Sequence, residues 1–184
     1  MNASLNKRHA SMLSAARTLC AAALIGYAPF ICATDEPQKH SIAIMDFELI
    51  DNTGESAKDA EQKRRLAMIS QQLREAIAEN QLYTVVDNAP AASLIAELQK
   101  RFELHSCNGC DVDIGHALNT PRVLTGWVQK VSNLILNINI QVRDVQTGNI
   151  VLNKSVDIRG NTDQTWSRGI RYMVRSMVEN KQAN

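Results

Sequence analysis

The sequence predicts an α/β protein of the α+β type, with a single mixed sheet that is antiparallel in its C-terminal half and helices mainly on one face. Two observations carry this prediction. In the first two thirds of the chain, segments with apolar residues three and four positions apart alternate with short β-branched runs, which indicates helices and strands in turn. The last third contains three consecutive β-rich runs with short connections, and such strands must pair as an antiparallel meander.

The first 33 residues differ from the rest of the chain. A basic start is followed by the uncharged run Leu19–Ala33, which is too short for a stable membrane-spanning helix of roughly 20 apolar residues. This arrangement is typical of a secretory signal. We therefore expect cleavage after Ala33 and a single periplasmic domain at 34–184, with no membrane span once the signal is removed. An uncleaved membrane anchor is the alternative.

Composition limits the function classes. The chain has 184 residues, of which 45% are hydrophobic, as expected for one domain with a real core. The formal charge of +1 argues against a nucleic-acid binder, which would show a basic patch or a high pI. Removal of the signal leaves Cys107 and Cys110 as the two remaining cysteines, in an oxidising compartment.

The first half of the domain is expected to form two strands and two helices. Ser41–Ile50 is an apolar run with β-branched residues, which predicts a buried strand. A helix follows from Ala57, because its apolar residues recur at three and four positions, and the strand Leu82–Asp87 comes next. Pro90 is tolerated in the first turn of a second helix. The apolar stripes are Leu66, Ile69, Leu73 and Ile77 in the first helix, and Leu94, Ile95, Leu98 and Phe102 in the second.

The second half is expected to contain a short helix at 111–118, three strands and a final helix. The strands are Arg122–Ser132, Asn133–Val145 and the returning strand at 149–160. Gly148 lies in the hairpin turn, where a positive φ is needed. Thr162 or Asp163 is expected to cap the last helix, whose buried stripe is Trp166, Ile170, Met173 and Met177.

The strand Asn133–Val145 alternates almost perfectly between aliphatic and polar residues. The aliphatic row must be covered by helices, and it consists of Leu134, Leu136, Ile138, Ile140 and Val142. Asparagine is depleted in strands, so the opposite row is either merely hydrated or a recognition surface. We predict that a protein partner binds there through Asn137, Asn139 and Gln141, with Arg143 at the rim. Trp127 on the neighbouring strand belongs either to the core or to this patch.

The segment from Cys107 to His116, "CNGCDVDIGH", allows several chemistries. A c-type haem is excluded, because Asp111 rather than histidine follows Cys110. A zinc site with His105 and His116 matches no common spacing, and a thioredoxin-like dithiol would open a long helix directly after a strand. A local disulfide that pins the loop is favoured, and we expect replacement of both cysteines by serine to lower stability only modestly.

No constellation of residues indicates an enzyme. Asp46 and Glu48 are spaced to share one face of a strand and could act as acid and base, but no histidine or serine motif completes the set. A role at the loop entry is favoured for them. We expect no catalytic residues, no cofactor and no bound metal.

Several segments resemble a known family, among them "IAIMDFELID", "CNGCDVDIGHAL" and "SVDIRGNTDQTWSRGIRYMV". They look like a family of small exported bacterial proteins of uncharacterised role, often encoded near quinoprotein alcohol dehydrogenases. More distantly, "IAIMDFE" and the "TG" hairpin resemble the N-terminal domain of the Tol-Pal periplasmic propeller protein and the periplasmic domain of the curli secretion pore.

The resemblance implies a non-enzymatic periplasmic accessory or binding protein that acts through protein contacts. Its partner would belong to a quinoprotein dehydrogenase system or to envelope transport or assembly. The alternative from the residues themselves is a thiol-redox or metal-handling protein that uses Cys107 and Cys110.

Overall fold

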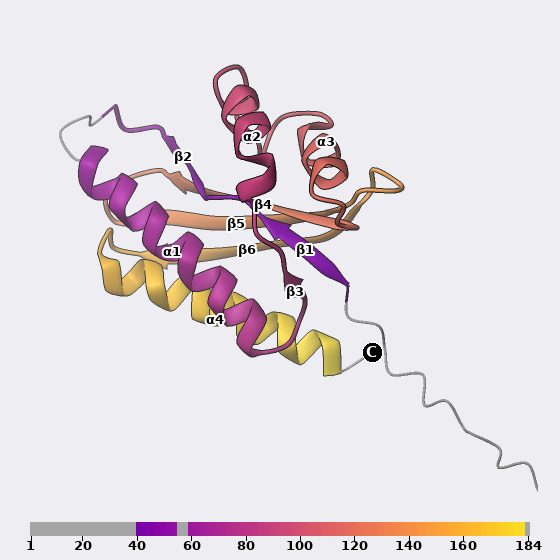
Figure 1. Ribbon diagram of the computed structural model, residues 1–184. Coiled ribbons are helices and arrows are strands. Elements are labelled where there is room, and N and C mark those ends of the chain that lie inside the picture. The colour runs from indigo at the N-terminus through magenta and orange to yellow at the C-terminus, as the bar shows by residue number, and fades with distance from the viewer. Residues whose placement is uncertain (1–39, 55–58, 183–184) are drawn as a thin grey trace, which may run out of the picture. The chain divides into compact units, whose positions relative to one another are not determined.

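The computed structural model describes residues 40–54 and 59–182, so the expected signal at 1–33 lies outside the described residues. Within them the chain forms one six-stranded sheet and four α-helices (Figure 1). The strand order is β3-β1-β4-β5-β6, and β2 also pairs with β4. The strands are β1 (Ser41–Ile44), β2 (Glu48–Asp51), β3 (Thr84–Val85), β4 (Arg122–Lys130), β5 (Ile135–Asp144) and β6 (Ile150–Arg159).

The sheet is mixed, as the sequence predicts. Strand β1 runs parallel to both β3 and β4, and β2 runs parallel to β4. Strands β4, β5 and β6 form an antiparallel meander. The predicted mixed sheet and the predicted antiparallel meander are therefore both confirmed.

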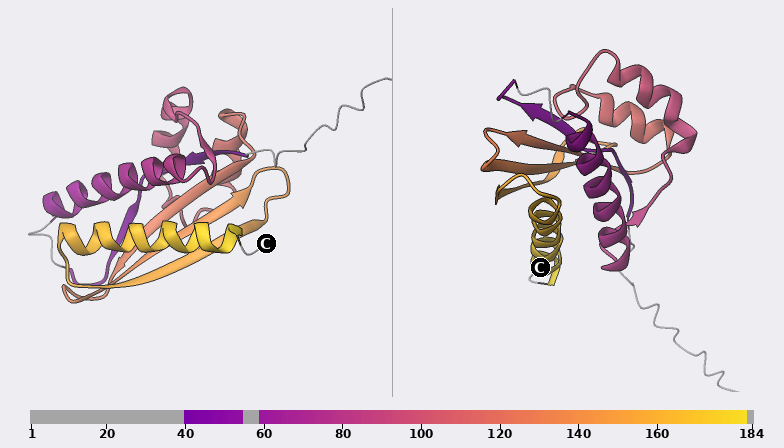
Figure 2. Two further views of the ribbon diagram at one scale, coloured as in Figure 1. Left: turned by 90° about the horizontal axis from the view of Figure 1, so that it is seen from below. Right: turned by 90° about the vertical axis from the view of Figure 1, so that its left-hand side faces the viewer.

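Two long helices, α1 (Asp59–Glu79) and α4 (Asp163–Gln182), pack side by side on one face of the sheet (Figure 2). Their apolar stripes meet the aliphatic row of β5, so that the side chains from Leu136 to Val142 in this row are fully buried. Burying such side chains drives folding by roughly 1.5–3 kcal/mol each. The predicted stripes of α1 and α4 are confirmed, and so is the buried position of four of the five aliphatic residues predicted for this face of the sheet.

The opposite face is covered only in part. A 3₁₀ turn (Ala89–Ala91) leads into α2 (Ala92–Gln99), and α3 (Cys110–Ala117) follows a loop. Together they form a second, smaller core over β1 and β4, which includes Ala43, Leu98, Ile114 and Val123. Figures 1 and 2 show these short helices on the side of the sheet away from α1 and α4.

The prediction of one continuous strand at Ser41–Ile50 is wrong, because the chain leaves the sheet between Ile44 and Phe47. The carbonyl oxygen of Ile44 accepts hydrogen bonds from Asn88 Nδ2 at 2.8 Å and from Arg74 Nη2 at 2.9 Å. The N–H of Phe47 donates to Ser70 Oγ at 2.9 Å. Side chains thus satisfy the backbone groups that the interrupted ladder leaves unpaired.

The chain returns to the sheet as β2, and a buried ion pair fixes β2 beside the C-terminal end of β4. Lys130 Nζ donates to Asp51 Oδ2 at 2.8 Å and to Thr53 Oγ1 at 2.9 Å, and the Lys130 side chain is fully buried. Burial by itself raises the pKa of Asp51, but hydrogen bonds from Lys130, Thr53 and Gln62 lower it by more, so the net shift is downward. Asp51 is therefore held as a carboxylate.

Three further predictions differ in detail from the structure. The strand expected at Leu82–Asp87 is reduced to the two residues of β3. Leu134 precedes β5 and its side chain is 72% exposed, so it does not belong to the buried row. Phe102 lies beyond the end of α2 and is also exposed.

Candidate functional site

The predicted partner-binding residues lie on the face of the sheet opposite α1 and α4. Cross-strand pairing sets Asn139 between Trp127 and Ser155, and Asn137 between Gln129 and Asp157. Residues directly opposite one another across a ladder point to the same face. We call this surface the polar face and define it as Trp127, Gln129, Asn137, Asn139, Gln141, Asn153, Ser155 and Asp157.

The polar face opens progressively from β4 toward β6. Its members on β4 and β5 are half-buried, whereas Asn153, Ser155 and Asp157 on β6 are exposed. The helices on this side pack mainly on β1 and β4, and α3 also contacts β5 at Arg143. The amide row of β5 is therefore a border between covered and open sheet, and less exposed than its sequence pattern suggests.

Hydrogen bonds order one end of the polar face. Asn137 Nδ2 donates to Asp157 Oδ1 at 2.6 Å, and Ser155 Oγ donates to Asn137 Oδ1 at 3.0 Å. The side-chain amides of Gln141 and Asn153 make no hydrogen bond to any other residue that the structure describes. Those two amides keep their donors and acceptors for water or a partner.

Trp127 forms the border of the polar face on the side that the loop after α2 covers. Its ring stacks on His105, with centroids 5.0 Å apart and planes at 24°. His105 Nδ1 lies 2.6 Å from Glu48 Oε2, and the two oxygens of Glu48 accept the backbone N–H groups of Leu104 and His105 at 2.7 and 3.0 Å. Trp127 is thus half-buried against the loop after α2, and Glu48 holds that loop in place.

Arg143 has an internal partner instead of an open rim position. It forms an ion pair with Asp111 of α3, whose side chain is buried, and its Nη1 donates to the carbonyl oxygen of Gly148 at 2.6 Å. The residue therefore ties β5 both to α3 and to the β5–β6 hairpin.

The two cysteines form a disulfide at the start of α3. Their Cα atoms are 5.6 Å apart, and Cys110 is only 3% exposed within the second core. Gly109 between them has φ +103°, a conformation that glycine adopts without strain. In the ranges that the structure describes, no group of three or more His, Cys, Asp or Glu side chains is placed to hold a metal ion.

Asp46 and Glu48 do not form a pair of facing carboxylates. Asp46 lies in the break between β1 and β2, where it is 68% exposed and forms an ion pair with Arg74 of α1 at 2.6 Å. Glu48 lies in β2 and binds the loop on the other side. The break rotates the chain between them, so the spacing expected for one strand face does not apply.

A groove along the outer edge of β6 was not predicted from the sequence. It has a volume of about 890 Å³ and lies between β6 and the outward side of α4. Four arginines line it, together with the exposed Tyr172. Its signal in the sequence is the spacing of Arg168, Arg171 and Arg175, which places three cations on one side of a helix.

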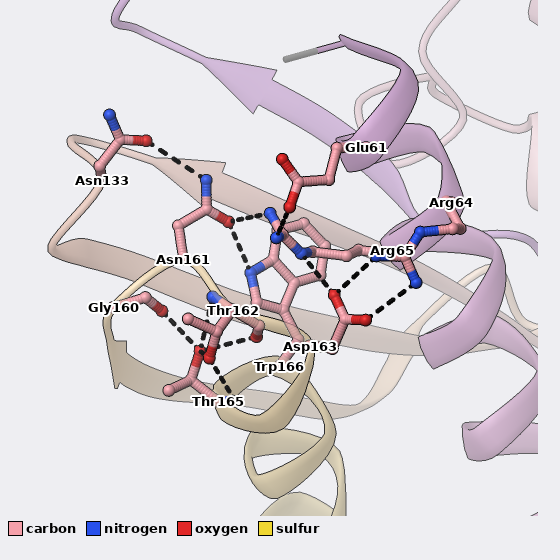
Figure 3. A network of polar contacts seen from close by, with 10 residues as sticks. All are labelled: Glu61, Arg64, Arg65, Asn133, Gly160, Asn161, Thr162, Asp163, Thr165 and Trp166. Atoms are coloured by element: carbon pink, nitrogen blue, oxygen red, sulfur yellow. Dashed lines mark hydrogen bonds and ion pairs between the residues drawn. The ribbon is translucent and has the colours of Figure 1, made fainter.

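The N-terminus of α4, beside this groove, is tied to α1 by a polar network (Figure 3). Asp163 accepts hydrogen bonds from Arg64 Nη1 and from Arg65 Nε, both at 2.8 Å. Asn161 Oδ1 accepts from Arg65 Nη1 at 3.1 Å and from Trp166 Nε1 at 3.0 Å. The hydrogen bonds from Arg64 and Arg65 lower the pKa of Asp163 to about 2.

Thr162 caps α4, and it is one of the two residues that the sequence predicted for this role. The N–H of Thr165 donates to Thr162 Oγ1 at 3.3 Å, and the N–H of Thr162 donates to Thr165 Oγ1 at 3.1 Å. This reciprocal pair satisfies two N–H groups at the helix start.

Among the described residues, no helix has the length and apolar composition needed to cross a lipid bilayer.

Several solved structures are similar to this one at low sequence identity. The LpoB C-terminal domain from Salmonella enterica is 18% identical with a TM-score of 0.48, and the match covers 66% of this chain and 83% of that one. PelC from Paraburkholderia phytofirmans, solved as a dodecamer, is 11% identical with a TM-score of 0.48, over 76% and 87% of the two chains. TolB from Acinetobacter baumannii is 16% identical with a TM-score of 0.42, over 76% of this chain and 29% of that one.

No curated protein matches the sequence significantly. A family model does match, over residues 40–178, and this range includes every strand, the disulfide and the polar face. The chain therefore belongs to the DUF3280 family, which is described as protein of unknown function (DUF2380).

Proposed function

We propose that the protein is a non-enzymatic binding protein of the periplasm, which contacts a protein partner through the polar face. The observation that supports this most is the open part of the sheet, where exposed polar side chains of β6 lie beside the half-buried amides of β5. Asp157 is the one carboxylate in this set, and it is hydrogen-bonded to Asn137. The surface is therefore rich in hydrogen-bonding groups and nearly uncharged.

A protein surface suits this face better than a small molecule does. Small-molecule sites are concave and mostly apolar, whereas a sheet face with amides and a half-buried tryptophan offers a broad contact area. Trp127 supplies the large aromatic group that interface hot spots favour, and the free amides of Gln141 and Asn153 supply directional hydrogen bonds. The periplasmic location rests on the signal pattern at 1–33.

The resemblance described for the sequence makes a quinoprotein alcohol dehydrogenase system the first place to look for the partner. Envelope transport or assembly is the second. In this proposal the disulfide has a structural role, because Cys110 is packed in the second core beside Ile114 and Val123.

The proposal is tested by photo-cross-linking in living cells. A photoreactive amino acid at Asn153 should give one cross-linked partner, identified by mass spectrometry, and the same group at Gln71 on the exposed side of α1 should not. The double substitution Asn139→Lys and Asn153→Lys should abolish co-purification of that partner while leaving the circular dichroism unchanged. A matched pair of charges, Gln71→Lys and Asn180→Lys, should have no effect.

Unchanged capture by the folded Asn139→Lys, Asn153→Lys protein would refute the assignment of the polar face. Loss of folding in that protein would mean that the face is covered in the native state.

A further inference from the structure

Strand β6 is a long open edge of the sheet. It has ten residues, contains no proline and pairs with β5 alone among the described residues. The one irregularity in its ladder lies at Val142/Arg143, opposite its first residues. From Leu152 to Arg159 it therefore presents a regular row of unpaired N–H and C=O groups, which is the template that another strand can extend.

Helix α4 forms the floor beside this edge. Gly169 allows it to approach closely, because a Cβ atom there would lie 2.7 Å from Ile138 Cδ1 and 2.9 Å from Ile158 Cγ2. The groove of about 890 Å³ that results is lined by Val156 and Ile158 of the strand and by the outward side of the helix. Tyr172, 54% exposed, stands on that side.

The groove is strongly basic. Arg159, Arg168, Arg171 and Arg175 all line it. Asp157 is the one carboxylate in its lining, and that side chain is turned to the polar face, where it accepts a hydrogen bond from Asn137. The Arg175 guanidinium lies over the Tyr172 ring, 5.3 Å from its centroid, so the basic groups and the aromatic ring form one surface.

We propose that this groove binds an extended acidic segment of a partner protein, which adds as a further strand to the edge of β6. The backbone of the segment satisfies the open N–H and C=O groups. Its alternate side chains point toward α4, and carboxylates at those positions pair with Arg168, Arg171 and Arg175. This binding site shares β6 with the polar face, because Ser155 and Asp157 also line the groove, but its binding groups are the backbone edge of β6 and the arginines of α4.

The spacings agree with this arrangement. Arg168 and Arg175 are two helical turns apart, which is about 11 Å along α4. Side chains on one face of a strand recur about every 6.7 Å, so two or three acidic side chains fit along that length. The arginines are long and flexible enough to absorb the remaining difference.

A second copy of this chain is a poorer occupant. Pairing of two β6 edges would bring both arginine sets together, and like charges at such distances repel. A single-stranded nucleic acid would meet the arginines but would leave the backbone groups of β6 without partners. The combination of an open strand edge and a basic floor favours an acidic peptide.

The test uses a fluorescein-labelled peptide of alternating valine and glutamate, long enough to pair with Leu152–Arg159, and measures its binding by fluorescence anisotropy. The full-length exported protein should bind it, and added salt should weaken binding. A peptide with lysine in place of glutamate should bind at least tenfold more weakly. A glutamate peptide with methylated backbone nitrogens on its pairing edge should also bind more weakly, because it cannot complete the ladder.

The matched variants separate this groove from general charge effects. The triple substitution Arg168→Ala, Arg171→Ala and Arg175→Ala should weaken binding about tenfold. The triple substitution Lys63→Ala, Lys100→Ala and Arg101→Ala makes the same change in net charge on exposed residues elsewhere and should have little effect. Should the first variant be poorly folded, Arg175→Ala alone gives a smaller loss in the same direction.

Hydrogen exchange identifies the mode of binding. The peptide should slow exchange of alternate backbone amides in β6, and amides of β3 at the other edge should not change.

Absence of binding, equal binding of the lysine peptide, or binding without protection of β6 would each overturn the proposal. Tighter binding of a fluorescent oligothymidine than of the glutamate peptide would assign the groove to a nucleic acid instead. A protein changed on β5 alone, Asn139→Lys with Gln141→Lys, should lose the partner of the polar face but still bind the peptide, so failure of one proposal can be distinguished from failure of the other.

Discussion

Glu48 anchors the loop between α2 and α3. Its two carboxylate oxygens accept two backbone N–H groups and contact the ring of His105, which in turn stacks on Trp127. A loop of this kind has few other ways to satisfy its N–H groups away from water. One carboxylate therefore fixes both the loop and the covered border of the polar face.

Replacement of Glu48 by glutamine should lower the free energy of unfolding by about 1–3 kcal/mol, because it weakens hydrogen bonds to a charged acceptor. Denaturant unfolding measures this. Glu103→Gln is the control, since Glu103 is exposed and approaches His105 only at 3.7 Å. Equal effects of the two substitutions would show that Glu48 does not anchor the loop.

Asp163 should make stability depend on acid pH. The hydrogen bonds from Arg64 and Arg65 lower its pKa from 3.8 to about 2 in the folded protein. The ionised form therefore favours folding at every pH above about 4, and this contribution is lost as the pH falls toward 2. The midpoint temperature of thermal unfolding should thus fall more steeply between pH 4 and pH 2 for the wild type than for Asp163→Asn. Parallel curves for the two proteins would contradict the network in Figure 3.

At the level of elements, the strongly periodic segments were predictable and the interrupted strand was not. The aliphatic row of β5 and the stripes of α1 and α4 follow from local spacing, because one face of each must be buried. The break after Ile44 depends on Arg74 and Asn88, which are distant in the sequence and supply donors to one carbonyl oxygen. The local sequence around Phe47 does not show that the side chains of Arg74 and Asn88 will lie beside the Ile44 carbonyl.

The disulfide is an element-scale constraint on the start of α3. It closes a very small ring, so it removes little chain entropy, and its stabilisation should lie at the low end of roughly 0–5 kcal/mol. Reduction of the native protein with dithiothreitol should lower the unfolding midpoint only slightly and leave the far-ultraviolet circular dichroism intact. Complete unfolding on reduction would restore a larger role for Cys107 and Cys110, and ready exchange with a redox partner would favour the thiol-redox function.

At the level of the whole molecule, the two cores share one sheet. Trp166 lies in the core between the sheet and the two long helices, and Trp127 lies on the other face beside His105. Because β4 contributes Leu124 to one core and Val123 to the other, neither core can come apart alone without disturbing the same strand. The groove at β6 could not be read from the sequence for a similar reason, since it needs α4 and an edge strand to be placed together.

The two tryptophans should therefore report one cooperative transition. Trp127→Phe and Trp166→Phe leave one fluorescent probe on each side of the sheet. Each variant, compared with its own circular dichroism, should show coincident unfolding curves. An earlier transition by Trp127 fluorescence than by circular dichroism would show that the layer of α2 and α3 opens separately.

The interior position of β1 has a consequence for the order in which the protein can fold. Ile42 pairs with Arg122, and β4 in turn pairs with β5, so the first described strand to leave the ribosome must wait for most of the chain before its long neighbour in the sheet is present. Such non-local pairing slows folding. A nascent chain that ends before Arg122 offers β1 only the two residues of β3 as a pairing partner, so the growing chain keeps β1 largely unpaired during this interval. That interval is when a chaperone would have to hold it.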